Sequence, residues 1–72
     1  MKSVDLLRTD DLCDRLSLGR ATVYRQVAAG RLPKPLRIGR AVRWRRAEIE
    51  AWIAAGCPPR ERWQWEASDD HR

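Results

Sequence analysis

Residues 16–53 read LSLGRATVYRQVAAGRLPKPLRIGRAVRWRRAEIEAWI, and this stretch holds signals for helices, a tight turn and a pair of strands. Its first part predicts a helix over Arg20–Ala29, in which Val23 and Val27 lie one turn apart on the buried side. Gly30 is expected to end this helix, because glycine readily adopts the left-handed conformation found at helix C-termini.

A shorter helix is predicted immediately upstream, over Asp10–Leu16. Thr9 would cap its free amides, and the acidic residues that follow suit the positive end of the helix dipole. Leu12 and Cys13 fall on its buried face, and Leu18 is expected to plug the space between the two helices. Two helices joined by a three-residue turn form a helix-turn-helix unit.

Two strands are predicted after the prolines, because residues 36–38 and 42–44 alternate apolar and basic side chains. A two-residue loop would mix apolar and basic side chains on each face of the hairpin, so we expect a three-residue loop at 39–41. This register places Arg37 beside Arg43 on the outer face, an arrangement that suits a phosphate between them. The expected pairs are Ile38 with Val42, Leu36 with Trp44, and Arg37 with Arg43.

A third helix is predicted over Ala47–Ala55, with Ile49 and Trp52 in its buried stripe and Gly56 as its stop. Trp44 and Trp52 are expected to be the two large side chains of the core. The expected fold class is therefore mainly α with a small β-hairpin: a winged helix-turn-helix of three helices and a two-stranded wing.

A chain of 72 residues has room for one domain, which we place at 1–56. Residues 57–72 form a C-terminal tail whose acidic residues outnumber its basic ones. Its tryptophans, Trp63 and Trp65, have three open interpretations: they fold back over the core, they dock on a neighbouring molecule, or the tail is disordered.

Charge is distributed unevenly along the chain. The net charge is +5, and residues 15–47 contain no Asp or Glu. A solvated surface usually mixes both signs, so this stretch favours a polyanionic partner such as nucleic acid. The basic residues in it are Arg15, Arg20, Arg25, Arg31, Lys34, Arg37, Arg40, Arg43, Arg45 and Arg46.

Several classes of function are disfavoured. No apolar run approaches the roughly 20 residues of a membrane span, and the N-terminus does not resemble a signal peptide. Cys13, Cys57 and His71 lack the spacing of metal ligands, so we expect no metal site and no cofactor. No nucleophile, base and carboxylate set is evident, so we expect no enzymatic activity. Without an export signal we expect the protein in the cytoplasm, where a disulfide is improbable.

The pieces TVYR, AGRLPKP, RIG, VRW and EIEAWI, in this order over about residues 5–55, resemble the AlpA-type prophage regulators and related phage excisionases. That resemblance implies a MerR-like winged helix-turn-helix that binds DNA at the nucleoid, either to control transcription or as an excisionase that directs a phage recombinase. Further copies of itself and a phage integrase are the partners it implies. Two departures stand out: Ser17 replaces the usual glycine and Gly19 the usual small hydroxyl residue. Gln26 also stands where the family is usually apolar.

The predicted contacts to double-stranded DNA come from the second helix, from the wing and the segment that leads into it, and from the start of the third helix, where Arg45 and Arg46 are expected on phosphates. Arg20 leads the helix and is the candidate reader of guanine, while the tip residue Arg40 suits a narrow minor groove. Tyr24 has an alternative interpretation, in which its ring packs on the segment Pro33–Pro35. Arg37 and Arg43 also have one, in which they only keep an exposed sheet edge soluble. The alternative function is a protein-interaction adaptor that uses the tail tryptophans. The full candidate set is Arg20, Ala21, Thr22, Tyr24, Arg25, Lys34, Arg37, Arg40, Arg43, Arg45 and Arg46.

Overall fold

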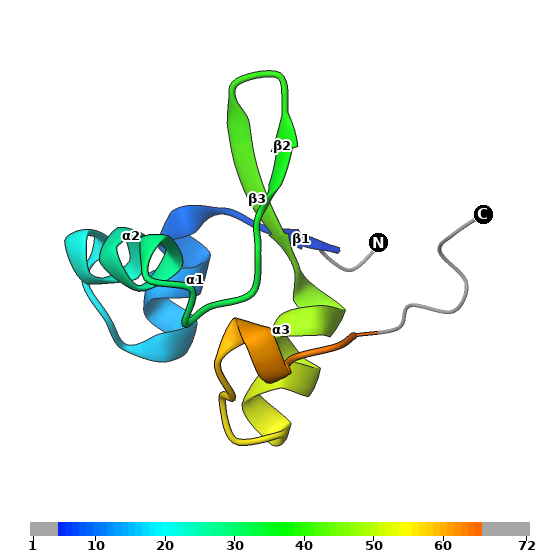
Figure 1. Ribbon diagram of the computed structural model, residues 1–72. Helices are drawn as coiled ribbons and strands as arrows, with labels where there is room; N and C mark the ends of the chain where they lie inside the picture. Colours follow the sequence, from blue (N-terminus) through cyan, green and yellow to red (C-terminus); the bar gives the residue numbers. More distant parts are fainter. Residues whose placement is uncertain (1–4, 66–72) are drawn as a thin grey trace.

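The computed structural model describes residues 5–65 and contains three α-helices and a small antiparallel sheet (Figure 1). The sheet has the strand order β1-β3-β2, and its β2–β3 hairpin projects away from the helices. The three predicted helices are confirmed to within one residue at each end. The elements are β1 (Leu6–Leu7), α1 (Thr9–Leu16), α2 (Arg20–Ala28), β2 (Leu36–Ile38), β3 (Ala41–Arg45), α3 (Arg46–Ala54) and the 3-10 turn η1 (Arg60–Arg62).

Helix α1 begins differently from the prediction. Arg8, not Thr9, occupies the N-cap position, and its backbone N–H donates a 3.0 Å hydrogen bond to Asp11 Oδ2. Thr9 is buried, being 8% exposed, and is the first residue inside the helix. The prediction that Thr9 caps α1 is therefore wrong. Asp11 stabilises the start of the helix by accepting this hydrogen bond from the residue that precedes it.

All three helices end in the same way. In each, a residue with positive φ follows the last turn, and two backbone N–H groups bond back to carbonyls three and five residues earlier. This is the Schellman arrangement, which satisfies carbonyls that the helix itself leaves free. The positive-φ residues are Ser17, Gly30 and Gly56, so both predicted glycine stops are confirmed and a serine takes the third position.

The register of the hairpin differs from the prediction. Arg37 pairs with Val42 and Leu36 pairs with Arg43, so the loop has two residues and not three. Residues directly opposite each other share a face. Arg37 and Arg43 therefore lie on opposite faces of the wing, and the expected pairing of these two arginines is wrong.

Turn chemistry explains the observed register. Gly39 is the first of the two loop residues and has φ +62°, which is the position that a type II′ turn reserves for glycine. The hairpin projects from the body (Figure 1), so most of its side chains are not in the core. A register that mixes apolar and basic residues on each face therefore removes little apolar surface from the core. Ile38 is accordingly 55% exposed.

A third strand, β1, was not predicted. It is two residues long and pairs Leu7 with Trp44 and Leu6 with Arg45. The chain before it also contributes, because Asp5 O accepts a 2.9 Å hydrogen bond from the backbone N–H of Arg46. The expected two-stranded wing is thus part of a three-stranded sheet, whose central strand β3 is held on both edges.

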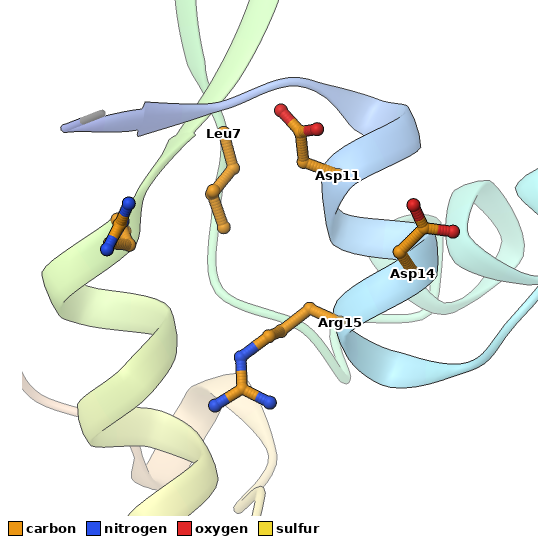
Figure 2. A pocket seen from close by; sticks show the side chains of 5 residues that line it. Leu7, Asp11, Asp14 and Arg15 are labelled. Atoms are coloured by element: carbon orange, nitrogen blue, oxygen red, sulfur yellow. The ribbon is translucent and has the colours of Figure 1, made fainter. Parts of the chain in front are cut away.

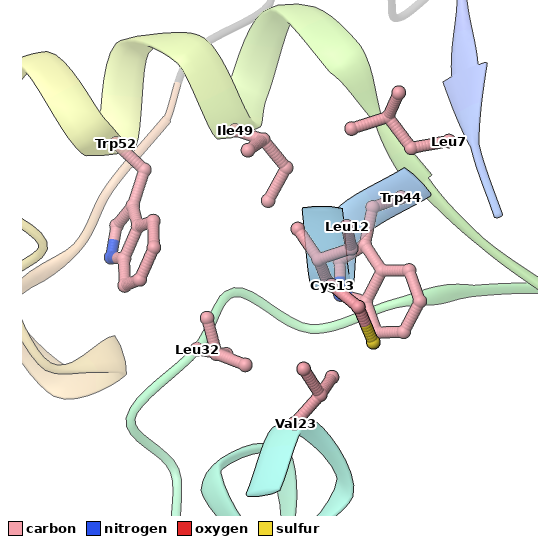
Figure 3. Close-up of a cluster of buried hydrophobic side chains, with 8 residues drawn as sticks. All are labelled: Leu7, Leu12, Cys13, Val23, Leu32, Trp44, Ile49 and Trp52. Carbon is pink, nitrogen blue, oxygen red and sulfur yellow. The ribbon is translucent and has the colours of Figure 1, made fainter. Parts of the chain in front are cut away.

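The core lies between the helices and the sheet (Figure 3). Trp44 and Trp52 are its large members, as predicted, and they are 1% and 4% exposed. Both indole N–H groups are satisfied by backbone carbonyls: Trp44 donates to Pro33 O at 3.1 Å and Trp52 to Pro58 O at 2.8 Å. The other buried hydrophobic residues are Leu7, Leu12, Cys13, Val23, Leu32 and Ile49.

Leu18 does not plug the space between α1 and α2. It is 37% exposed and lies at the edge of a shallow apolar groove of about 340 Å³, to which Leu16 and Trp52 also contribute. Leu32, from the segment after α2, is 2% exposed and belongs to the core.

The described part of the predicted tail, residues 57–65, packs on the body, while residues 66–72 of that prediction lie outside the described residues. Trp63 lies partly buried against the core, and its indole N–H donates a 3.0 Å hydrogen bond to Glu48 Oε2. Arg60 reaches back across the end of α2, with Nε 2.9 Å from Leu32 O and Nη2 3.0 Å from Val27 O. Of the three interpretations of the tryptophans, folding back is the one that holds for Trp63.

Candidate nucleic-acid interface

Helix α2 divides its surface into three strips, because side chains recur every 3.6 residues. Val23 is fully buried, and Val27 packs beside it against the core. The side opposite these valines carries Ala21 and Arg25, both exposed. This ridge is the part of α2 best placed to enter a groove.

The two flanks of α2 differ in character. On one flank, Thr22 and Gln26 line the apolar groove, and Thr22 Oγ1 accepts a 3.3 Å hydrogen bond from Arg25. On the other flank, Arg20 and Tyr24 approach the start of α1. The predicted helix contacts are therefore spread over the exposed ridge and both of its sides.

A polar hollow of about 200 Å³ lies where the starts of α1 and α2 meet β3. Arginines reach it from the N-cap of α1, from α2 and from β3, and none of them is adjacent to another in sequence. An opening of this size lined by guanidinium groups suits an anionic oxygen cluster such as a phosphate. Its lining residues are Arg8, Thr9, Asp10, Arg20 and Arg43.

Arg20 is held on two sides. Its guanidinium forms an ion pair with Asp10, and Nη2 lies 3.5 Å from the hydroxyl of Tyr24. Its Cζ also lies 5.9 Å from the centre of the Tyr24 ring, within the range of a cation–π contact. The negative charge of Asp10 raises the pKa of Arg20, and the hydrogen bond between the two side chains raises it further.

The hydroxyl of Tyr24 lies toward the start of α1. Tyr24 is 46% exposed, and its hydroxyl donates a long 3.5 Å hydrogen bond to Thr9 Oγ1. Tyr24 therefore links α2 to the first turn of α1, beside the hollow.

The wing presents its arginines in several directions. Arg37 and Arg40 are exposed, with Arg40 in the turn at the tip. Arg43 lies near the base of the hairpin, where it lines the hollow and donates a 2.9 Å hydrogen bond to Val42 O. Lys34 is exposed in the segment that leads into the wing.

Arg45 and Arg46 contact side chains outside the hollow. Arg45 is 3.8 Å from Glu48, and its Cζ lies 5.7 Å from the centre of the Trp65 ring. Arg46 lines a wider cleft of about 440 Å³ between α1 and α3, together with Asp11 and Asp14 (Figure 2). Neither arginine lines the hollow that Arg20 and Arg43 share.

Arg15 also lines this cleft and forms an ion pair with Glu50 that joins α1 to α3. Figure 2 shows Arg15 extending from α1 toward α3, where its Nε lies 2.9 Å from Glu50 Oε2. The hydrogen bond from Arg15 lowers the pKa of Glu50. Arg15, one of the ten basic residues of the acid-free stretch, thus serves a contact within the molecule.

Sequence reasoning missed Arg8 and Asp10 as members of this interface. Both precede the acid-free stretch at 15–47, and the two aspartates at the start of α1 were explained as favourable charges at a helix N-terminus. No local signal reveals their approach to Arg43, because that approach depends on how α1 packs against the sheet.

A comparison with protein families matches residues 6–57 to the helix-turn-helix domain, over more than half of the chain. The chain belongs to the helix-turn-helix domain family. Searches of curated proteins and of solved structures each returned no match. A helix-turn-helix domain implies binding to double-stranded DNA, and in this one the hollow joins the start of the second helix to the wing.

Two further findings concern the part of this helix-turn-helix protein that the structure describes. Within residues 5–65, no helix is long and apolar enough to cross a membrane. In the same range, no group of three or more His, Cys, Asp or Glu side chains is placed to hold a metal ion. Cys13 is buried in the core, as predicted, and Cys57 is exposed; both are free.

Proposed function

We propose that this helix-turn-helix protein recognises a specific sequence in duplex DNA, as a transcriptional regulator or as a factor that directs a phage recombinase. Helix α2 would lie in the major groove, with Ala21 and Arg25 toward the bases and Arg20 at its leading end. The wing would follow the adjacent backbone or enter the minor groove with Arg40. Such a protein would act in the cytoplasm, at the nucleoid, and would not be an enzyme.

The observation that supports this proposal most is the hollow between α2 and the wing. Arg8 at the N-cap of α1, Arg20 of α2 and Arg43 of β3 converge on one opening, in which Arg8 and Arg43 would hold a phosphate beside Arg20. A phosphate in this opening would anchor the backbone between the groove that α2 reads and the groove that the wing approaches. Contacts of this kind set the position of a protein on DNA without reading its sequence.

A salt titration tests the proposal. With roughly four to six phosphate contacts, log affinity for a duplex should fall with log salt with a slope of about −4 to −5. A flat dependence would contradict DNA binding. Footprinting of the bound sites would then separate the two roles, because a recombination factor protects an attachment site and a regulator protects a promoter.

The adaptor alternative has less support in the structure. It requires Trp63 on the surface, whereas Trp63 packs against the core and donates to Glu48. Cooperative binding of several copies is a separate proposal, since one small module buries only about 600–1,000 Å² of its own surface on DNA. Binding curves on one site and on two adjacent sites would measure it.

A further inference from the structure

The hollow beside α2 contains a carboxylate among its arginines. Asp10 is the only acidic member of its five lining residues, and its oxygen is paired with the guanidinium of Arg20. A carboxylate in this position disfavours a phosphate next to Arg20, whatever it contributes to the start of α1. The side chains of Asp10 and Arg20 are 76% and 56% exposed, so the pair is open to any DNA that approaches.

The free energy of an exposed ion pair of this kind is small, so the Asp10–Arg20 pair does not prevent DNA from binding. It can, however, change how strongly Arg20 contacts one DNA group compared with another. Its effect on binding therefore depends on what the DNA offers Arg20. A phosphate is anionic, so Asp10 competes with it for the guanidinium and repels its oxygens. The O6 and N7 edge of a guanine is uncharged, and a carboxylate nearby does not repel it in the same way.

The guanidinium can also serve both partners at once. Arginine has five N–H donors, and Asp10 engages Nη1 while Nη2 lies near Tyr24 at 3.5 Å. A base edge in the groove can take the donors that Asp10 leaves free. Asp10 thus opposes contact with phosphate more than contact with a base.

We propose, resting on the DNA-binding function above, that Asp10 is a specificity-determining residue: it holds Arg20 and keeps it from the phosphates of non-cognate DNA. It lowers affinity for random duplex more than affinity for the selected site. The Tyr24 ring completes the arrangement, because it holds the guanidinium near Asp10 in the free protein.

The test compares Asp10→Asn with Asp14→Asn, which removes one charge from the same helix at the cleft facing α3. Two probes are used: a random-sequence duplex, and a duplex enriched from a randomised pool by the wild-type protein. We expect Asp10→Asn to raise affinity for the random duplex roughly three- to tenfold and to steepen its salt slope by about 1. Affinity for the enriched duplex should rise less, so discrimination falls.

Asp14→Asn should raise affinity for both duplexes alike. In an Arg20→Ala background, Asp10→Asn should then have no more effect than Asp14→Asn, because the group that Asp10 restrains is gone. Equal effects of Asp10→Asn and Asp14→Asn in the wild-type background would overturn the inference. So would weaker binding of Asp10→Asn to the enriched duplex alone, since Asp10 would then help Arg20 read DNA.

Failure of the inference is distinguishable from failure of the proposed function. If the wild-type protein binds no duplex with salt-dependent affinity, the DNA-binding proposal itself is wrong. If wild-type binding is normal and only the Asp10 comparison fails, the inference alone is wrong. Both aspartates are exposed, and thermal unfolding of each variant checks that the fold is retained.

Discussion

Ser17 occupies a backbone position that the other two helices give to glycine. Its φ is +57°, and the same pair of backbone hydrogen bonds surrounds Ser17, Gly30 and Gly56. A side chain with a Cβ is strained in this region, whereas glycine is not. The turn after α1 therefore has a local weakness that its neighbours lack.

We predict that Ser17→Gly stabilises the protein by about 0.5–1 kcal/mol, because the relief of strain exceeds the added freedom of the unfolded chain. Gly39→Ala supplies the opposite case. Gly39 has φ +62° with open space around it, so an alanine there should destabilise by about 1 kcal/mol through the backbone alone. Thermal unfolding measures both, and destabilisation by Ser17→Gly would contradict this account of the turn.

Arg20 and Arg43 line one hollow, but we predict different roles for them. Arg20→Ala should reduce affinity for the enriched duplex roughly 10- to 100-fold and relax the preference at one base pair. Arg43→Ala should weaken binding to enriched and random duplexes by similar factors, because a phosphate contact carries no sequence information. Equal losses on both duplexes for Arg20→Ala would assign base readout to another residue of α2, with Arg25 the first to test.

At the level of elements, the Arg15–Glu50 pair joins α1 to α3. Arg15 lowers the pKa of Glu50, so the charged carboxylate stabilises the folded state at any pH above the ordinary carboxyl pKa. This contribution is lost as the pH falls through the lowered pKa of the folded state. Since both side chains are about half exposed, the effect is modest and decreases with added salt.

We predict that Glu50→Gln lowers the midpoint of thermal unfolding at neutral pH. As the pH falls below the usual carboxyl range, the wild-type midpoint should converge on that of the variant. Melting curves at a series of pH values provide the measurement, with Glu61→Gln as a control at an exposed acidic residue in η1. A difference between wild type and Glu50→Gln that is independent of pH would exclude the ion pair as its cause.

For the whole molecule, residues 57–65 are part of the folded body. The side chain and backbone N–H of Arg60 donate to the carbonyls of Val27, Leu32 and Gly30 at 2.9–3.0 Å. This segment therefore satisfies carbonyls at and after the end of α2, and Trp63 covers the core beside it.

We predict that Arg60→Ala destabilises the protein by about 1–3 kcal/mol, because carbonyls covered by Arg60 lose a charged donor. Arg62→Ala, in the same exposed turn, should change stability by less than about 0.5 kcal/mol. Denaturant unfolding distinguishes them, and equal stability of the two variants would mean that the segment is not structural. A chain ending at Cys57 should also be less stable, so any loss of cooperative DNA binding in it must be corrected for unfolding.

The amino-acid sequence alone predicted the three helices, the end of two of them at Gly30 and Gly56, and the burial of Trp44 and Trp52. These features depend on signals within a few residues: apolar side chains at helical spacing, and glycine where φ is positive. The basic stretch likewise follows from composition, and it agrees with the DNA binding that the family implies.

Only the tertiary structure decided the strand register, the third strand and the position of the C-terminal segment. The alternation of apolar and basic side chains favoured a register with a three-residue loop. Because the wing projects from the body, little burial depends on its register, and the turn at Gly39 sets the observed two-residue loop. Leu7 and Trp63 join the core from chain positions far from their partners. Asp10 meets Arg20 only because α1 and α2 fold against each other, and contacts between distant residues leave no periodic trace in the sequence.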